Sequence, residues 1–133
     1  MAGGKSRRFG TSKTLTQVGG LSLACRPIST LKDAGLSGGV ISSEDGLEFA
    51  LGSPVRPDLE PGKGPLGGLL TALVWAKERK QLGVFLLGCD MPFVSVQLIE
   101  LLLSKIDGSA AVVPVGRAGL EPLCGFYPSS CCQ

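Results

Sequence analysis

Short blocks of hydrophobic residues alternate with polar stretches along the chain, and glycine and proline separate the blocks. The run GVFLLG at residues 83–88 is continuous and apolar, which predicts a strand buried on both faces. Four leucines between residues 66 and 73 recur at the i, i+3, i+4, i+7 spacing of one helix face. We expect this helix to begin at Gly64-Pro65, because proline is favoured at the first helical position. A similar pattern at residues 94–106 predicts a second amphipathic helix.

The remaining blocks predict shorter elements. Residues 22–34 indicate a helix that Gly35 stops, and Pro27 inside it should kink it. The alternation of strands and helices predicts one α/β domain over residues 1–133 with a mainly parallel sheet. Further strands are expected at residues 38–43, 54–58, 110–115 and 122–128, with a short extended piece at 14–20 and a short helix at 43–51.

Composition narrows the class of protein. A chain of 133 residues that is 44% hydrophobic and 18% charged can build a core and suits one domain. The net charge of +2 is too small for a protein that binds long nucleic acids. Four of the basic residues, Lys5, Arg7, Arg8 and Lys13, crowd the N-terminal segment. This uneven distribution favours a small anionic ligand over a long polyanion.

Cysteine and histidine usage excludes several kinds of site. The five cysteines have no regular spacing, so they do not form a disulfide framework. The sequence has no histidine and no CxxC pair, which argues against a zinc site and against catalysis by a Ser-His-Asp or Cys-His arrangement. Cys131-Cys132 should lie in a frayed end. No apolar run approaches the roughly 18 residues of a membrane span, so we expect a cytoplasmic location.

The opening stretch MAGGKSRRFGTSK combines glycines with cations. Its spacing does not fit the P-loop pattern GxxxxGK[ST], and GxGxxG is absent too. Backbone N–H groups of Gly3 and Gly4 could still approach phosphates closely, with Arg8 and Lys13 supplying charge. The alternative is a flexible basic N-terminal tail.

Two aspartates follow predicted strands. Asp58 ends the strand at 54–58, and Asp90 follows the run at 83–88 with only Cys89 between them. Ligands of open α/β sheets bind beyond the carboxyl ends of strands, so we expect both carboxylates to converge with the opening loop on one crevice. A hard carboxylate at Asp90 suits Mg²⁺. Either aspartate could instead be a turn residue at a strand end, Asp58 before a loop rich in proline and glycine.

Four stretches, in order, resemble a known family. AGGKSRRFGTSK is similar to the LAGGxSxRxGxxK signature of MobA-type nucleotidyltransferases, and GPLGGLLTAL, LLGCDMPFVS and RAGLEPLCGFYP resemble its later motifs. The resemblance spans residues 1 to about 128 and implies a Rossmann-like three-layer sandwich. The family's first strand has no counterpart before Met1, and members continue beyond Gln133, so we expect a chain shortened at both ends. The family's nucleotide-contacting asparagine, near the end of the second strand, has no match here, so Ser42 or Ser43 would have to substitute for it.

The resemblance also implies a reaction and its residues. Family members transfer GMP from GTP to molybdopterin with Mg²⁺ and release pyrophosphate. Asp90 would hold the metal, and Arg8 would stabilise charge on the leaving pyrophosphate. CMP transfer from CTP to the same cofactor, or nucleotide binding without catalysis, are the alternatives. The implied nucleotide contacts are Met1, Ala2, Gly3, Gly4, Lys13, Asp58 and Asp90, with Arg8, Lys13 and Asp90 as the implied catalytic residues.

Overall fold

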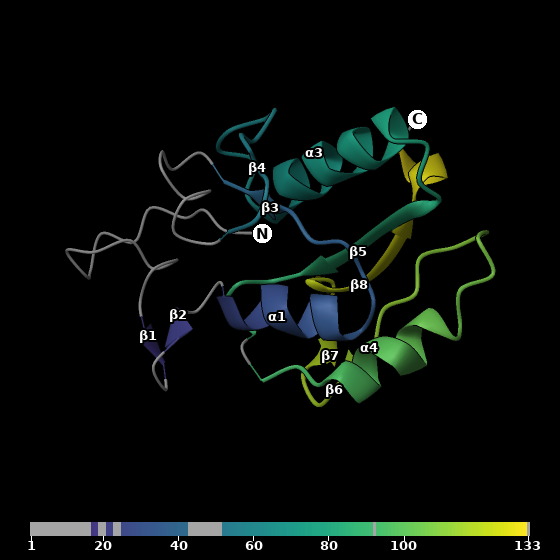
Figure 1. Cartoon of the computed structure of the whole chain (residues 1–133). Helices are drawn as coiled ribbons and strands as arrows, with labels where there is room; N and C mark the ends of the chain where they lie inside the picture. The colour runs from purple at the N-terminus through teal and green to yellow at the C-terminus, as the bar shows by residue number, and fades with distance from the viewer. Residues whose placement is uncertain (1–16, 19–20, 23–24, 43–51, 92, 133) are drawn as a thin grey trace.

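The structure is a computed structural model that describes residues 17–18, 21–22, 25–42, 52–91 and 93–132. Its described elements form three layers (Figure 1). Helix α3 (Pro65–Glu78) packs on one side of strand β5 (Gly83–Leu87), which pairs with β8 (Cys124–Pro128). Helices α1 (Cys25–Asp33) and α4 (Val96–Leu103) contact one another on the opposite side. The expected α/β class is therefore confirmed.

The pairing of the strands differs from the expected mainly parallel sheet. Within the described ranges the strands form four separate pairs, of which only β3 with β4 is parallel. The β5–β8 pair is antiparallel, with Phe85 opposite Phe126. No pairing joins β3 to β5 in the described part of the chain, so a continuous sheet is not formed. The pairs are β1 (Gln17–Val18) with β2 (Leu21–Ser22), β3 (Val40–Ile41) with β4 (Val55–Arg56), β5 with β8, and β6 (Val115–Gly116) with β7 (Gly119–Leu120).

Helix α1 begins three residues later than expected, which changes the role of Pro27. The helix starts at Cys25, so Pro27 lies in the first turn. First-turn N–H groups have no acceptor inside a helix, and proline therefore loses no bond there. The predicted kink was wrong for this reason. The C-terminal end matches the expectation: Gly35 has a φ of 81°, and Leu36 N donates to Leu31 O at 3.0 Å in a Schellman-type cap.

Helix α3 begins at Pro65 as predicted, but its buried face is not the leucine face. Leu66 is 73% exposed and Leu70 is 38% exposed, whereas Leu73 is buried. The reason is that small residues, Gly67, Gly68, Thr71 and Ala76, form the stripe that packs inward. A helix can approach neighbouring backbone more closely through such a stripe than through leucines.

Helix α4 carries the largest apolar cluster. Ser95 caps it, because the Ser95 Oγ accepts a hydrogen bond from Leu98 N at 3.2 Å. Ile99 is fully buried and packs with Leu87 of β5 and Cys124 of β8. Burial of one such side chain contributes about 2–3 kcal/mol to folding. This cluster fixes the position of β5 and of the residues that follow it.

Two C-terminal expectations are corrected. The stretch 110–115 forms only an isolated bridge between Val112 and Phe126, followed by the short β6. The end of the chain is not frayed up to residue 132, because Ser129–Cys131 form a 3-10 turn. Ser129 ties this turn to the start of β5: its N–H donates to Leu82 O at 2.8 Å. Within the described ranges, none of the helices has the length and apolar character that crossing a membrane requires.

Candidate functional site

Three polar residues follow three strand ends. Ser42 follows β3, Asp58 lies two residues after β4, and Asp90 comes three residues after β5. Because β3 and β4 are parallel, Ser42 and Asp58 belong to the same edge, and Ser42 N donates to Arg56 O at 3.0 Å. The ribbons of β3 and β5 run toward the same side of the molecule (Figure 1). The carboxyl ends of these strands therefore share one side, as expected for an α/β ligand site.

Asp58 is anchored through one carboxylate oxygen. Its Oδ1 accepts from Glu60 N at 3.1 Å, which closes an Asx turn. The hydroxyl of Thr71, which is fully buried in α3, lies 3.0 Å from the same oxygen and accepts from Leu59 N at 2.9 Å. Asp58 therefore has the turn-forming role that was one of the two alternatives for it in the sequence. Oδ2 is not used in these bonds, so the carboxylate retains an oxygen that a ligand could approach.

The close packing around Gly67 explains why this position at the start of α3 is a glycine. A Cβ built on Gly67 would lie 2.7 Å from Glu60 O and 3.3 Å from Asp58 Oδ1. The helix start and the loop after β4 are therefore in closer contact than any side chain allows. Glycine at this position allows the helix to pack closely against the loop that holds Asp58. The spacing of apolar residues in the sequence does not predict this contact.

Asp90 lies in a tight turn directly after β5. Met91 N donates to Gly88 O at 3.2 Å, and a Cβ on Gly88 would lie 2.8 Å from Asp90 Oδ1. Gly88 thus leaves room for the carboxylate. Asp90 itself is exposed to solvent. An exposed carboxylate at the end of a buried strand is available to a cation or a ligand without unfolding the turn.

The turn at Asp90 contacts a segment before β8 that the sequence did not predict to lie there. Gly88 N donates to Leu123 O at 2.8 Å, so the segment before β8 lies against the Asp90 turn. Tyr127 braces that segment, because its hydroxyl donates to Pro122 O at 2.7 Å. The antiparallel pairing of β5 with β8 brings the two turns together. The only signal in the sequence was the motif RAGLEPLCGFYP, which carries no information on distance.

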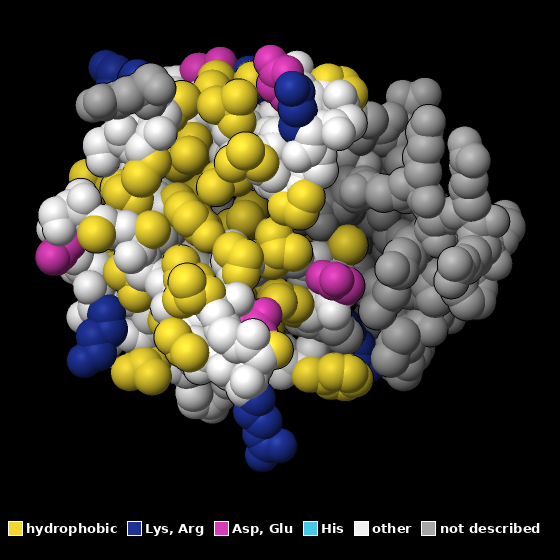
Figure 2. All heavy atoms as spheres, turned by 180° about the vertical axis from the view of Figure 1, so that it is seen from behind, with side chains coloured by type: hydrophobic (Ala, Val, Ile, Leu, Met, Phe, Trp, Pro, Cys, Tyr) yellow, Lys and Arg dark blue, Asp and Glu magenta, His cyan; other side chains and the backbone are white. Residues whose placement is uncertain are grey.

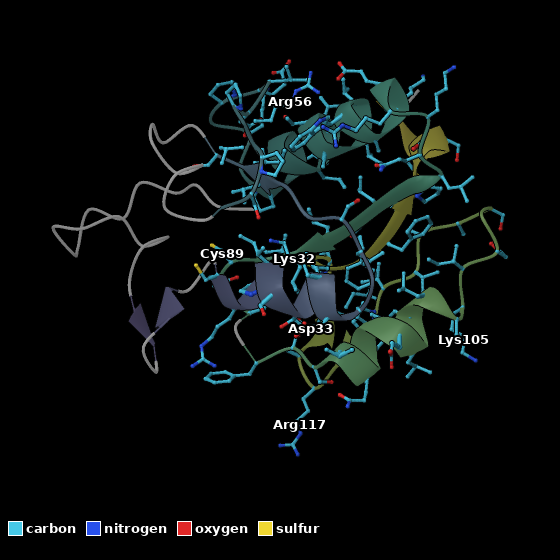
Figure 3. All side chains as sticks on the ribbon, viewed as in Figure 1. Lys32, Asp33, Arg56, Cys89, Lys105 and Arg117 are labelled. Carbon is cyan, nitrogen blue, oxygen red and sulfur yellow. The ribbon has the colours of Figure 1, made fainter. Side chains whose placement is uncertain are left out.

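Cys89 behaves as the expected small buried residue. It is half-buried and packs against the cluster of Ile28 and Val40. Figure 3 places Cys89 beside the start of α1, while Lys105 and Arg117 point outward elsewhere. Arg56 is also directed elsewhere, since its guanidinium pairs with Glu78 in a two-pronged ion pair.

The Asp, Glu and Cys side chains near Asp90 can be compared with the ligands that a divalent cation requires. Among the described residues, no group of three or more Cys, Asp or Glu side chains is close enough to hold a metal ion. Asp90 alone is a hard oxygen donor, so a cation there would complete its shell with water and phosphate oxygens. Mg²⁺ binds in that way, usually through one or two carboxylates. The site fits Mg²⁺ carried with a phosphate ligand and does not fit a closed, all-protein metal cage.

The glycine-rich and basic part of the predicted site lies outside the described residues. It comprises Met1, Ala2, Gly3, Gly4, Arg8 and Lys13, and Ser43 lies outside as well. The roles expected for these residues, and the convergence of Asp58 and Asp90 with them, stay predictions.

An α/β fold with polar residues after its strand ends is typical of proteins that bind a ligand beyond the carboxyl ends of their strands. The chain matches the MobA-like NTP transferase domain over residues 1–133, and it belongs to that family. Similar proteins include the probable molybdenum cofactor guanylyltransferases of Pelotomaculum thermopropionicum, 38% identical over 98% of this chain, and of Carboxydothermus hydrogenoformans, 31% identical over 98%. A solved structure, molybdopterin-guanine dinucleotide biosynthesis protein A from Archaeoglobus fulgidus, superposes with a TM-score of 0.72 at 23% identity over 98% of this chain. The chain spans 62%, 64% and 66% of these three proteins, respectively.

Proposed function

We propose that this chain carries the nucleotide half of a guanylyltransferase site and takes part in the transfer of GMP from GTP to molybdopterin. The observation that carries the proposal is the exposed Asp90 carboxylate in the turn after β5, in a chain that belongs to the MobA-like family. The names of the similar proteins support a guanine nucleotide and the molybdenum cofactor as the two substrates.

The proposed reaction is a displacement at phosphorus. An oxygen of the acceptor's terminal phosphate attacks the α-phosphorus of GTP. A new P–O bond forms, the bond from the α-phosphorus to the β-phosphate oxygen breaks, and pyrophosphate leaves with the bonding electrons. No nucleophilic side chain is required, so catalysis depends on positioning and on neutralising charge.

Each residue would have its own role in binding the nucleotide or in neutralising charge. Asp90 would hold Mg²⁺, which when bound neutralises phosphate charge. Lys13 would bind the triphosphate, and Arg8 would stabilise the charge that develops on pyrophosphate. The backbone at Met1, Ala2, Gly3 and Gly4 would line the nucleotide. Asp58 would contact it through the carboxylate oxygen that its own turn leaves available.

The test is nucleotide binding by the chain with Mg²⁺ present. A ligand that binds only the folded state raises the melting temperature by mass action. We expect GTP with Mg²⁺ to raise it and CTP or ATP to have little effect. Formation of the guanine dinucleotide from GTP and molybdopterin is the second readout. A shift with CTP alone would contradict the guanine assignment. A shift with GTP and no product would indicate binding without catalysis.

A further inference from the structure

One buried hydroxyl lies directly behind Asp58. It belongs to Thr71 of α3, which is fully buried, and its oxygen meets three partners. It accepts a hydrogen bond from Leu59 N at 2.9 Å, and it lies 3.0 Å from both Gly67 O and Asp58 Oδ1. Thr71 therefore connects the helix to the aspartate and also to the residue that follows the aspartate.

The proton of the Thr71 hydroxyl has two possible acceptors. Gly67 O is the carbonyl four residues earlier in the same helix, and it is a neutral acceptor. Asp58 Oδ1 belongs to a carboxylate, and hydrogen bonds to an ionised group are about twice as strong as bonds between neutral groups. We therefore expect the single proton of the hydroxyl to lie toward Asp58, while a lone pair of the same oxygen holds Leu59 N.

The Asp58 carboxylate is held through one of its two oxygens. Oδ1 accepts from Glu60 N at 3.1 Å and also faces the Thr71 hydroxyl. Within the described ranges these are the only partners of the carboxylate, and Oδ2 has none. Asp58 is half-buried and follows β4 at the edge where β3 ends as well. The carboxylate thus presents Oδ2 as an acceptor from a fixed position.

The positive charges of the described residues do not gather around Asp58. Asp58 forms no ion pair within the described part of the chain, and Arg56, the nearest cation in the sequence, pairs with Glu78 instead. From behind, the described Lys and Arg side chains stand singly around a broad area of hydrophobic side chains (Figure 2). That face therefore offers no cluster of cations that would hold phosphate groups.

The chemistry of Oδ2 selects the part of a nucleotide that can bind Asp58. A carboxylate accepts hydrogen bonds and does not donate them, and its charge repels the oxygens of a phosphate. A ligand group at Oδ2 must therefore be a donor. The nucleoside part of a nucleotide has such donors, namely the sugar hydroxyls and the N–H groups of the base, whereas the ionised phosphates have none.

We propose that Thr71 is a positioning residue of the nucleotide site: its hydroxyl holds Asp58 so that Oδ2 accepts a hydrogen bond from the nucleoside part of the nucleotide. This inference rests on the proposed function, in which Asp58 contacts the nucleotide. Thr71 is fully buried, so it acts on the ligand only through Asp58 and the turn. Its removal weakens the binding of the nucleoside part and leaves the binding of the phosphates unchanged.

The test compares Thr71→Val, which keeps the shape and lacks the hydroxyl, with Thr71→Ser, which keeps the hydroxyl. Calorimetric titration measures the dissociation constants of GTP and of inorganic tripolyphosphate, each with Mg²⁺, and an NMR titration measures that of guanosine. We expect Thr71→Val to weaken GTP and guanosine by the same factor, about tenfold, since a hydrogen bond to a charged group is misplaced. Tripolyphosphate binding should not change. Thr71→Ser should bind all three ligands like the natural chain.

A double variant tests whether Thr71 acts through Asp58. In Asp58→Ala the carboxylate is gone, so adding Thr71→Val should cost no further GTP affinity, although each single change weakens binding. The matched control is Thr30→Val, which removes a hydroxyl that donates to the carbonyl four residues earlier in α1, Arg26 O, at 2.9 Å. This control should leave the affinity for GTP unchanged.

The results distinguish the role of Thr71 from the proposed function. Equal GTP binding by Thr71→Val and the natural chain would overturn this inference and leave the proposed function intact. Weaker tripolyphosphate binding in Thr71→Val, or a further loss in the double variant, would show a general loosening of the site and would also overturn it. A natural chain that binds neither GTP nor guanosine would contradict the proposed function, and this inference with it.

One measurement does not depend on the folding of any variant. NMR three-bond couplings between Hα and Hβ report the χ1 angle of Asp58 in the natural chain. We expect the couplings of a single staggered rotamer without ligand, and the same couplings with GTP and Mg²⁺ bound. Couplings averaged over several rotamers in the free chain would overturn the proposal, because the hydroxyl would then not hold the carboxylate.

Discussion

The hydroxyl of Thr71 lies 3.0 Å from Asp58 Oδ1, so one fully buried side chain connects helix α3 to the turn after β4. The same hydroxyl lies 3.0 Å from Gly67 O and accepts from Leu59 N. The position of Asp58 is therefore set by the helix behind it as well as by its own turn.

Replacing Thr71 by valine should destabilise this junction. The variant Thr71→Val keeps the volume but removes the partner of Leu59 N and one partner of Asp58. A buried polar group left without a partner costs about 1–3 kcal/mol, and we expect a loss in that range. Urea unfolding measures it. Thr71→Ser, which keeps the hydroxyl, should lose less, and an equal loss in Thr71→Ser would contradict the hydroxyl as the main contributor at this position.

Replacing Gly67 by alanine should destabilise the protein although it favours the helix. Alanine gains about 1 kcal/mol over glycine in a helix interior. The new Cβ would lie 2.7 Å from Glu60 O, and such overpacking costs about 1–3 kcal/mol. We expect a net loss of about 1 kcal/mol in the free energy of unfolding, measured with urea. A gain in stability would show that the loop at residues 58–63 yields easily.

The ion pair between Arg56 and Glu78 should give a stability difference that depends on pH. The hydrogen bond from Arg56 holds the pKa of Glu78 below its usual value. A carboxyl group of this kind contributes stability that is present above its unfolded pKa, about 4.3, and is lost as pH falls through the lower folded value.

The variant Glu78→Gln should therefore melt slightly lower than the natural chain at pH 7, and the difference should disappear as pH falls through the lowered pKa of Glu78. The effect is small because both side chains reach solvent, and salt should reduce it further. Melting temperatures across this pH range measure it. Glu100→Gln alters an exposed carboxylate on α4 and serves as the control. A difference that grows in acid would contradict the assignment.

Asp90→Asn tests the proposed metal ligand. Asparagine has nearly the same shape, so the exposed turn after β5 should persist and the melting temperature should change little. Loss of the charge should reduce Mg²⁺-dependent stabilisation by GTP at least tenfold in apparent affinity, because a hard cation prefers a carboxylate. Asp107→Asn removes a carboxylate in the loop after α4 and should have no such effect. Equal GTP binding in both variants would remove Asp90 from the metal site.

Sequence periodicity predicted the elements but not their contacts. The start of α3 at Pro65, the strand at Gly83–Leu87 and the cap at Gly35 follow from local rules, and the structure confirms them. The buried face of α3 was not predictable, because it depends on the approach of the loop at 58–63 to Gly67. Apolar spacing alone favours leucines for such a face.

The candidate site was likewise predictable in its local elements and not in its long-range contacts. The position of Asp90 just after a buried strand could be predicted from an apolar run followed by a polar residue. The contact of its turn with the segment at Leu123 could not, since it follows from long-range antiparallel pairing of β5 with β8. Sequence patterns record the strand ends, whereas the pairing of strands decides which ends meet.

Trp75 of helix α3 can report by its fluorescence on the space between α3 and the strands β3 and β5. It is the single tryptophan of the chain, and its ring lines a cavity of about 500 Å³. The guanidinium groups of Arg79 and Arg56 lie 5.0 Å and 5.9 Å from the ring centre. The indole therefore has two cations near it and borders this cavity. Tryptophan emission moves to shorter wavelength when water leaves the ring, so the colour of the intrinsic fluorescence reports directly whether the space between the two strand pairs is wet or filled.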